Sequence, residues 1–151
     1  MAVKTIEWKN DRVIMIDQRL LPHREVYRVC RDYHRVAAAI RSMVIRGAPA
    51  IGVAAAMGVA LGALMAPAKT FDRAFERIVN TLAKTRPTAV NLFWALQRMR
   101  EVYLATRSQG IDTVRRALKE EAQKIYKEDI ASNRQLGKHG VALLDHAQHI
   151  M

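Results

Sequence analysis

The sequence has little of several residue types that mark particular classes of protein. Its 151 residues include one cysteine, four prolines and seven glycines, and 6% of them are aromatic. The lone Cys30 cannot form an internal disulfide or a multi-cysteine zinc site, which excludes a disulfide scaffold and favours a reducing compartment, so we expect the cytoplasm. A hydrophobic share of 50% excludes collagen-like and low-complexity chains. Because Lys4, Glu7, Lys9 and Asp11 interrupt any apolar run, we expect no signal peptide.

Acidic side chains are scarce beside the basic ones. The chain has 25 lysines and arginines against 14 acidic residues, a formal charge of +11. The excess is spread over the first two thirds of the chain and is not gathered in one tail or helix, so a small anion suits it as well as a nucleic acid does. The chain has no recognisable DNA-binding motif and no stretch of stacking aromatics, and we expect no nucleic-acid partner.

Metal-ligand patterns are also lacking. The five histidines have no metal spacing supported by nearby carboxylates. His139 and His146 could share a helix face, but two ligands are too few for a zinc site. We therefore expect no metal.

The residue pattern predicts a mainly α fold. Short β-branched or aromatic segments at 5–8, 12–16 and 25–30 predict a small antiparallel sheet. From Asp32 onward the hydrophobic period becomes helical. We expect a single domain spanning 1–151, in which 1–30 form the sheet and 31–151 form about five to six helices.

Proline, glycine and capping residues predict where those helices begin and end. The first is capped by Asp32 and ends near Ile45, and the second runs from Pro49 to about Met65. Thr70 and Thr88 are expected to cap the third and fourth. A fifth follows Gly110, and the late apolar positions predict either its continuation or a sixth helix: Leu136, Val141 and Leu144.

No charged residue occurs between Arg46 and Lys69, a run long enough to span a bilayer. A membrane interpretation would cite the GxxxG pattern from Gly58 to Gly62. The run is rich in alanine and glycine and has few large apolar residues, which gives a poor insertion energy. We therefore expect the central helix of a packed core, and no membrane partner.

Two arginines precede predicted helix starts. In Arg46-Gly47-Ala48-Pro49, Gly47 permits a positive φ and Pro49 begins a helix, so free N–H groups and a guanidinium would together form an anion site. Arg86 likewise precedes a proline, immediately before the next predicted helix. The two arginines could grip one phosphorylated small molecule. Spacing alone leaves open the alternative that both pair with surface carboxylates.

These segments resemble one enzyme family. Residues 46–52 (RGAPAIG), followed by Ala54-Ala55-Ala56, look like the signature loop and helix of the 5-methylthioribose-1-phosphate isomerases, and residues 86–92 (RPTAVNL) match that family's second motif. Further similarity lies in 6–8, in 17–22 and in later helical positions, in order from residue 6 to 137. The wider superfamily includes ribose-1,5-bisphosphate isomerases and regulatory subunits of the guanine-exchange complex of a translation initiation factor.

The resemblance implies an aldose–ketose isomerisation of a sugar phosphate in methionine salvage, without metal or nucleotide cofactor. It implies that Arg46, Gly47, Ala48 and Arg86 bind substrate. The family's catalytic cysteine and aspartate belong to a C-terminal Rossmann-like α/β domain that this chain is expected to lack, and Cys30 matches no family motif. We therefore expect no catalytic residue and no turnover in this chain, and a full-length form that dimerises largely through the missing domain.

Two other functions remain. A regulatory or scaffold module related to the exchange-factor subunits could keep the arginine loops for sensing a nucleotide or a sugar phosphate. A nucleic-acid binder is supported by net charge alone. A cysteine-bearing strand and a later aspartate following Met151 would favour the enzyme, and their loss would favour the regulator.

Overall fold

The computed structural model describes residues 4–144, without the side chains of residues 142 and 143, and confirms the mainly α fold. Within that range the strands are β1 (Ile6–Lys9), β2 (Arg12–Ile16) and β3 (Tyr27–Cys30). The α-helices are α1 (Tyr33–Arg41), α2 (Ala48–Met65), α3 (Phe71–Ala83), α4 (Val90–Thr106) and α5 (Ile111–Leu144). Short 3-10 turns, Ala68–Thr70 and Arg107–Gln109, precede α3 and α5.

The three strands form an antiparallel sheet in the order β1-β2-β3. Ile6 pairs with Met15, and Val13 pairs with Cys30. The turn between β1 and β2 is made by Asn10 and Asp11, whose φ angles of 50° and 51° suit residues that tolerate the left-handed region. One face of the sheet is buried against the helices, which gives this small sheet the support it needs.

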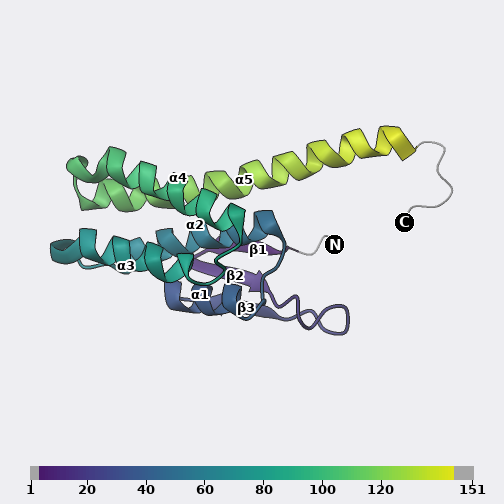
Figure 1. Cartoon of the computed structure of the whole chain (residues 1–151), viewed down its shortest axis with the longest axis horizontal. Helices are drawn as coiled ribbons and strands as arrows, with labels where there is room; N and C mark the ends of the chain where they lie inside the picture. The colour runs from purple at the N-terminus through teal and green to yellow at the C-terminus, as the bar shows by residue number, and fades with distance from the viewer. Residues whose placement is uncertain (1–3, 145–151) are drawn as a thin grey trace.

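α2 is the centre of the core. Every residue from Ile51 to Ala63 is buried, and the helix packs against the other four α-helices and against β1 and β2. α4 and α5 lie together on one side of it, and the sheet and α1 lie on the other (Figure 1). Arg115 of α5 donates to the carbonyl of Ala63 in the last turn of α2 at 3.3 Å, and to that of Ala66, the residue after the helix, at 2.7 Å.

α2 has the length and hydropathy of a membrane span, with a mean hydropathy of 1.9, but 72% of it is buried inside the fold. Its small residues admit close neighbours. A Cβ added at Gly62 would lie 2.7 Å from Ile78 Cδ1, and one added at Gly58 would lie 3.1 Å from Leu82 Cδ2. The GxxxG pattern therefore lets α3 approach a core helix, as expected.

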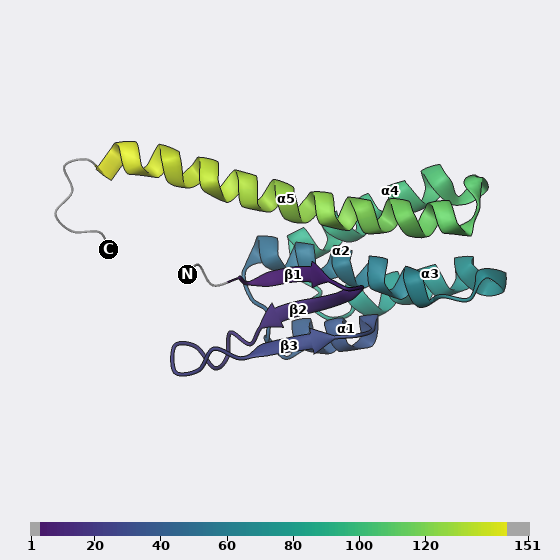
Figure 2. The ribbon, with the colours of Figure 1, turned by 180° about the vertical axis from the view of Figure 1, so that it is seen from behind.

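Several predicted boundaries were wrong. α1 ends at Arg41 and not near Ile45, because the chain turns at Met43, whose φ is +59°. Thr70 precedes α3 but its side chain makes no capping hydrogen bond, and α4 is preceded by Ala89 and not by Thr88. The late apolar positions continue α5, a single helix of 34 residues that extends beyond the body of the fold (Figures 1 and 2).

Candidate functional site

The loop that enters α2 has the geometry expected of an anion site. Gly47 is the N-cap residue with φ 94°, and it has no side chain with which to cap the helix. A Cβ at Gly47 would meet nothing within 4 Å, so conformation and not space requires glycine here. The first helical bond runs from Ile51 N to Gly47 O at 3.0 Å. The earlier N–H groups of Ala48 and Ala50 have no partner within the helix and lie at its positive end.

Two hollows flank this helix start. The larger, here called the Arg46 hollow, has a volume of about 800 Å³ and lies between the α2 loop, β1 and α5. Its charged and amide-bearing lining residues are Lys4, Gln18, Arg46, Asp129, Asn133 and Arg134. The smaller, the Trp94 hollow, has a volume of about 450 Å³ and lies between α2, α4 and α5. Pro49 and Asp129 line both, so the start of α2 divides them.

Positive charge predominates in the Arg46 hollow. Three cationic residues line it, Lys4, Arg46 and Arg134, against one acidic residue, Asp129. Lys4 also pairs with Glu7 at 2.8 Å, and this hydrogen bond raises the pKa of the lysine. The cations and the positive end of α2 together suit a small anion such as a phosphate monoester.

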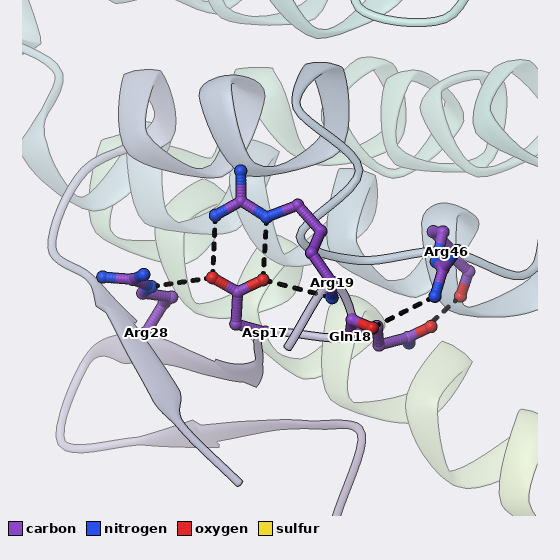
Figure 3. Close-up of polar contacts among 5 residues, drawn as sticks. All are labelled: Asp17, Gln18, Arg19, Arg28 and Arg46. Carbon is purple, nitrogen blue, oxygen red and sulfur yellow. Dashed lines mark hydrogen bonds and ion pairs between the residues drawn. The ribbon is translucent and has the colours of Figure 1, made fainter. Parts of the chain in front are cut away.

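Arg46 is attached to the turn that follows β2 (Figure 3). Its guanidinium Nη2 donates to Gln18 O at 3.1 Å, and Gln18 Nε2 donates to Arg46 O at 3.3 Å. Gln18 N also donates to Val44 O at 2.9 Å. The turn therefore holds both the main chain and the side chain of the arginine at the mouth of α2.

Asp17, at the start of that turn, carries a fully buried carboxylate. Arg19 donates to it from Nε at 2.8 Å and from Nη2 at 2.7 Å, and Arg28 Nε donates at 3.0 Å (Figure 3). The hydrogen bonds from Arg19, followed by that from Arg28, hold the pKa of Asp17 well below its usual range despite its burial. Sequence reasoning missed this group, because no motif marks a carboxylate whose second arginine lies eleven residues away.

The second arginine motif differs from its prediction. Arg86 does not immediately precede a helix: a turn closed by Ala89 N and Arg86 O at 3.1 Å comes first, and α4 begins at Val90. The two motifs do meet, because a Cβ added at Gly52 would lie 2.9 Å from Asn91 O. Arg86 is half-buried and lines neither hollow.

Of the four predicted binding residues, Arg46 and Gly47 line the Arg46 hollow, whereas Ala48 and Arg86 line neither hollow. Ala48 is exposed in the first turn of α2, where its N–H and not its methyl group is available to a ligand. That Arg46 and Arg86 meet at one ligand stays a prediction.

Other chemistry-bearing groups are engaged elsewhere. Burial raises the pKa of the Cys30 thiol to about 11, which is unsuited to a nucleophile. On α5, Glu128 pairs with Arg98, which also lies 5.4 Å from the Trp94 ring. Within residues 4–144, no cluster of three or more histidine, cysteine or acidic side chains could hold a metal ion.

The comparisons with known proteins agree with the motifs. The initiation factor 2 subunit family matches residues 44–151. The methylthioribose-1-phosphate isomerase of Trichlorobacter lovleyi is 51% identical over 100% of the chain, which spans 44% of that protein. The isomerase of the same name from Geobacter metallireducens is 54% identical over 95% of the chain and 42% of its own length. The chain thus spans less than half the length of these relatives.

Two solved structures share the fold. The crystal structure of 5-methylthioribose 1-phosphate isomerase from Pyrococcus horikoshii OT3 has a TM-score of 0.88 and 41% identity over 92% of the chain and 40% of that protein. Translation initiation factor eIF-2B, subunit delta, from A. fulgidus has a TM-score of 0.86 and 33% identity over 95% of the chain and 42% of that protein. Since the family match covers most of the sequence and these structures share its fold, the chain belongs to the initiation factor 2 subunit family.

Proposed function

We propose that this chain is the substrate-binding N-terminal part of a methylthioribose-1-phosphate isomerase. The observation that carries the proposal is the Arg46 hollow, where cationic side chains surround the uncapped start of α2. The phosphate of the sugar would accept hydrogen bonds from the N–H groups of Ala48 and Ala50 and from the Arg46 guanidinium. Arg86 would add a second guanidinium to the phosphate or to a sugar oxygen.

The contribution of this chain would be to bind and orient. An aldose–ketose isomerisation moves a hydrogen between C1 and C2 and needs an acid–base pair at those carbons. Asp129, the carboxylate that lines the hollow, accepts a hydrogen bond from Asn133 at 3.0 Å. We assign the acid–base pair to residues outside this chain, and we expect the isolated chain to bind the sugar phosphate without converting it.

The proposal also covers the setting of the protein. We place it in the cytoplasm, in methionine salvage, with no cofactor. For the full-length form we propose a homodimer built largely through an α/β part, as the family resemblance implies.

The likeness to an eIF-2B subunit favours a second candidate, a regulatory module. In that case the cationic hollow would sense a nucleotide or a sugar phosphate and would need no acid–base groups. The two candidates differ in ligand preference where the regulator senses a nucleotide. The first predicts that methylthioribose-1-phosphate binds more tightly than a guanine nucleotide, and a nucleotide-sensing regulator predicts the reverse.

Calorimetric titration of the purified chain with methylthioribose-1-phosphate tests the first candidate. Losing a charge-assisted hydrogen bond weakens binding by roughly tenfold to a hundredfold, and we expect that loss for Arg46→Gln. The matched control is Arg41→Gln, which removes the same charge from an exposed position at the end of α1. Equal losses of affinity in the two variants would mean that only the net charge matters, and would contradict a binding site at Arg46. Turnover of the sugar phosphate by the isolated chain would contradict the assignment of the acid–base pair elsewhere.

A further inference from the structure

The turn after β2 combines a buried charge with a direct connection to the candidate site. Asp17 is fully buried, and Arg19 and Arg28 hold it. It is the only buried ionisable carboxyl or amine among the residues that the structure describes. A buried carboxylate is retained at low cost only when its hydrogen bonds are complete, so its partners hold the turn in one arrangement.

The bonds at Asp17 restrain the turn from two directions. Arg19 contacts both carboxylate oxygens and also donates its backbone N–H at 3.3 Å, which closes the turn on itself. Arg28 comes from β3, and its bond ties the turn to the sheet. The residue between Asp17 and Arg19 is therefore fixed in place from both sides.

That residue is Gln18, which contacts the α2 loop through three hydrogen bonds. Its backbone N–H reaches Val44 O, its side-chain amide reaches Arg46 O, and its carbonyl accepts from the Arg46 guanidinium. An exposed arginine side chain otherwise samples many rotamers, and ordering it on binding has an entropic cost. Gln18 restricts the Arg46 side chain before any ligand arrives.

We propose that Asp17 is a positioning residue for phosphate recognition, acting through Gln18 to hold the Arg46 guanidinium beside the uncapped start of α2. The inference rests on the proposed function, since it concerns the anion site assigned there. Asp17 itself is buried away from solvent and lines neither hollow. Removing its charge would loosen the turn, free the Arg46 side chain and weaken binding at a distance.

A purely structural role for Asp17 would have a different signature. It would lower the stability of the fold, and the effect of the substitution on ligand binding would not depend on Arg46. Two measurements separate these cases: a double-mutant cycle between positions 17 and 46, and the Arg46 Nε–Hε signal in nitrogen–proton spectra, identified by its loss in Arg46→Gln.

We expect Asp17→Asn to weaken the binding of methylthioribose-1-phosphate and of inorganic phosphate by about tenfold, and to have almost no further effect in the Arg46→Gln background. In the folded Asp17→Asn chain without ligand, the Arg46 Nε–Hε signal should move to the position of a mobile arginine. Additive losses in the cycle, or an unmoved Arg46 signal in a folded Asp17→Asn chain, would overturn the proposal.

Arg19→Gln keeps the experiment decisive if Asp17→Asn fails to fold, because it removes the side-chain hydrogen bonds that Arg19 donates to Asp17 and leaves the Gln18 side chain unchanged. Its matched control is Arg41→Gln, which removes the same charge from an exposed position. The Arg46 signal should move in the first variant alone, and a signal that moves in neither would overturn the proposal. The spectra need no ligand, so they test whether Asp17 positions Arg46 even if no sugar phosphate binds. Failure of the wild-type chain to bind the sugar phosphate would reject the proposed function alone.

Discussion

Gly52 allows α2 and α4 to touch where the two arginine motifs meet, and replacing it tests that contact. An ideal Cβ at this position would lie 2.9 Å from Asn91 O and 3.4 Å from Asn91 C. Both are backbone atoms, so no rotamer change can relieve the overlap and the helices must separate. Overpacking of this kind costs about 1–3 kcal/mol, whereas alanine gains about 1 kcal/mol over glycine within a helix. For Gly52→Ala we therefore expect a net loss of about 1 kcal/mol, which lowers the melting temperature by about 3 °C.

The control is Gly137→Ala, at an exposed position in α5 where a new Cβ meets nothing within 4 Å. Only the gain in helix propensity applies there, so stability should stay the same or rise. Urea unfolding followed by circular dichroism measures both variants against wild type. If Gly52→Ala instead stabilised the fold by the full helix-propensity gain of about 1 kcal/mol, the result would contradict the close approach of α2 to Asn91. We also expect Gly52→Ala to weaken methylthioribose-1-phosphate binding, because it displaces the second motif from the first.

Two further predictions follow from groups held in or near the sheet. The hydrogen bonds from Arg19 and Arg28 lower the pKa of Asp17 in the folded chain below its ordinary value of 3.8. The ionised carboxylate therefore stabilises the fold above pH 3.8, and this stabilisation is lost as the pH falls through the pKa of the folded chain. The gap in urea midpoint between wild type and Asp17→Asn should therefore shrink below about pH 3, and a gap that stays constant would contradict the pairing. Burial raises the pKa of Cys30 to about 11, so a thiol reagent at mildly alkaline pH should label the native chain far more slowly than the urea-unfolded chain; equal rates would contradict its burial.

The start of α2 could be predicted because its determinants are local. Gly47 supplies the positive φ, Pro49 suits the first turn, and the alanine- and glycine-rich uncharged run that follows favours a helix buried on all sides. The caps at Thr70 and Thr88 could not be predicted in the same way. A threonine before a helical stretch is compatible with a cap, but whether its hydroxyl reaches the first turn depends on the path by which the chain arrives.

The buried carboxylate shows what sequence reasoning cannot reach. Asp17 and Arg28 meet because β2 and β3 pair antiparallel in a register that places Met15 opposite Arg28. That register depends on the buried face of the sheet and not on any motif near Asp17. The same holds for Gln18 and Arg46, which are 28 positions apart and become neighbours only when the turn after β2 packs beside the α2 loop.

The two arginines that the sequence motifs single out differ in how firmly the fold holds them. Arg46 is held by the turn after β2, beside a helix whose far end is held by Arg115 and whose body is the core of the fold, so its donors begin in a restrained position. Arg86 lies in a turn four residues before α4 and has no ion pair within the part of the chain that the structure describes. Under the proposed function, the restrained Arg46 and the uncapped start of α2 would anchor a phosphate without an acid–base group. The same anchor would serve an isomerase or a regulator, and we expect it to bind a sugar phosphate without converting it.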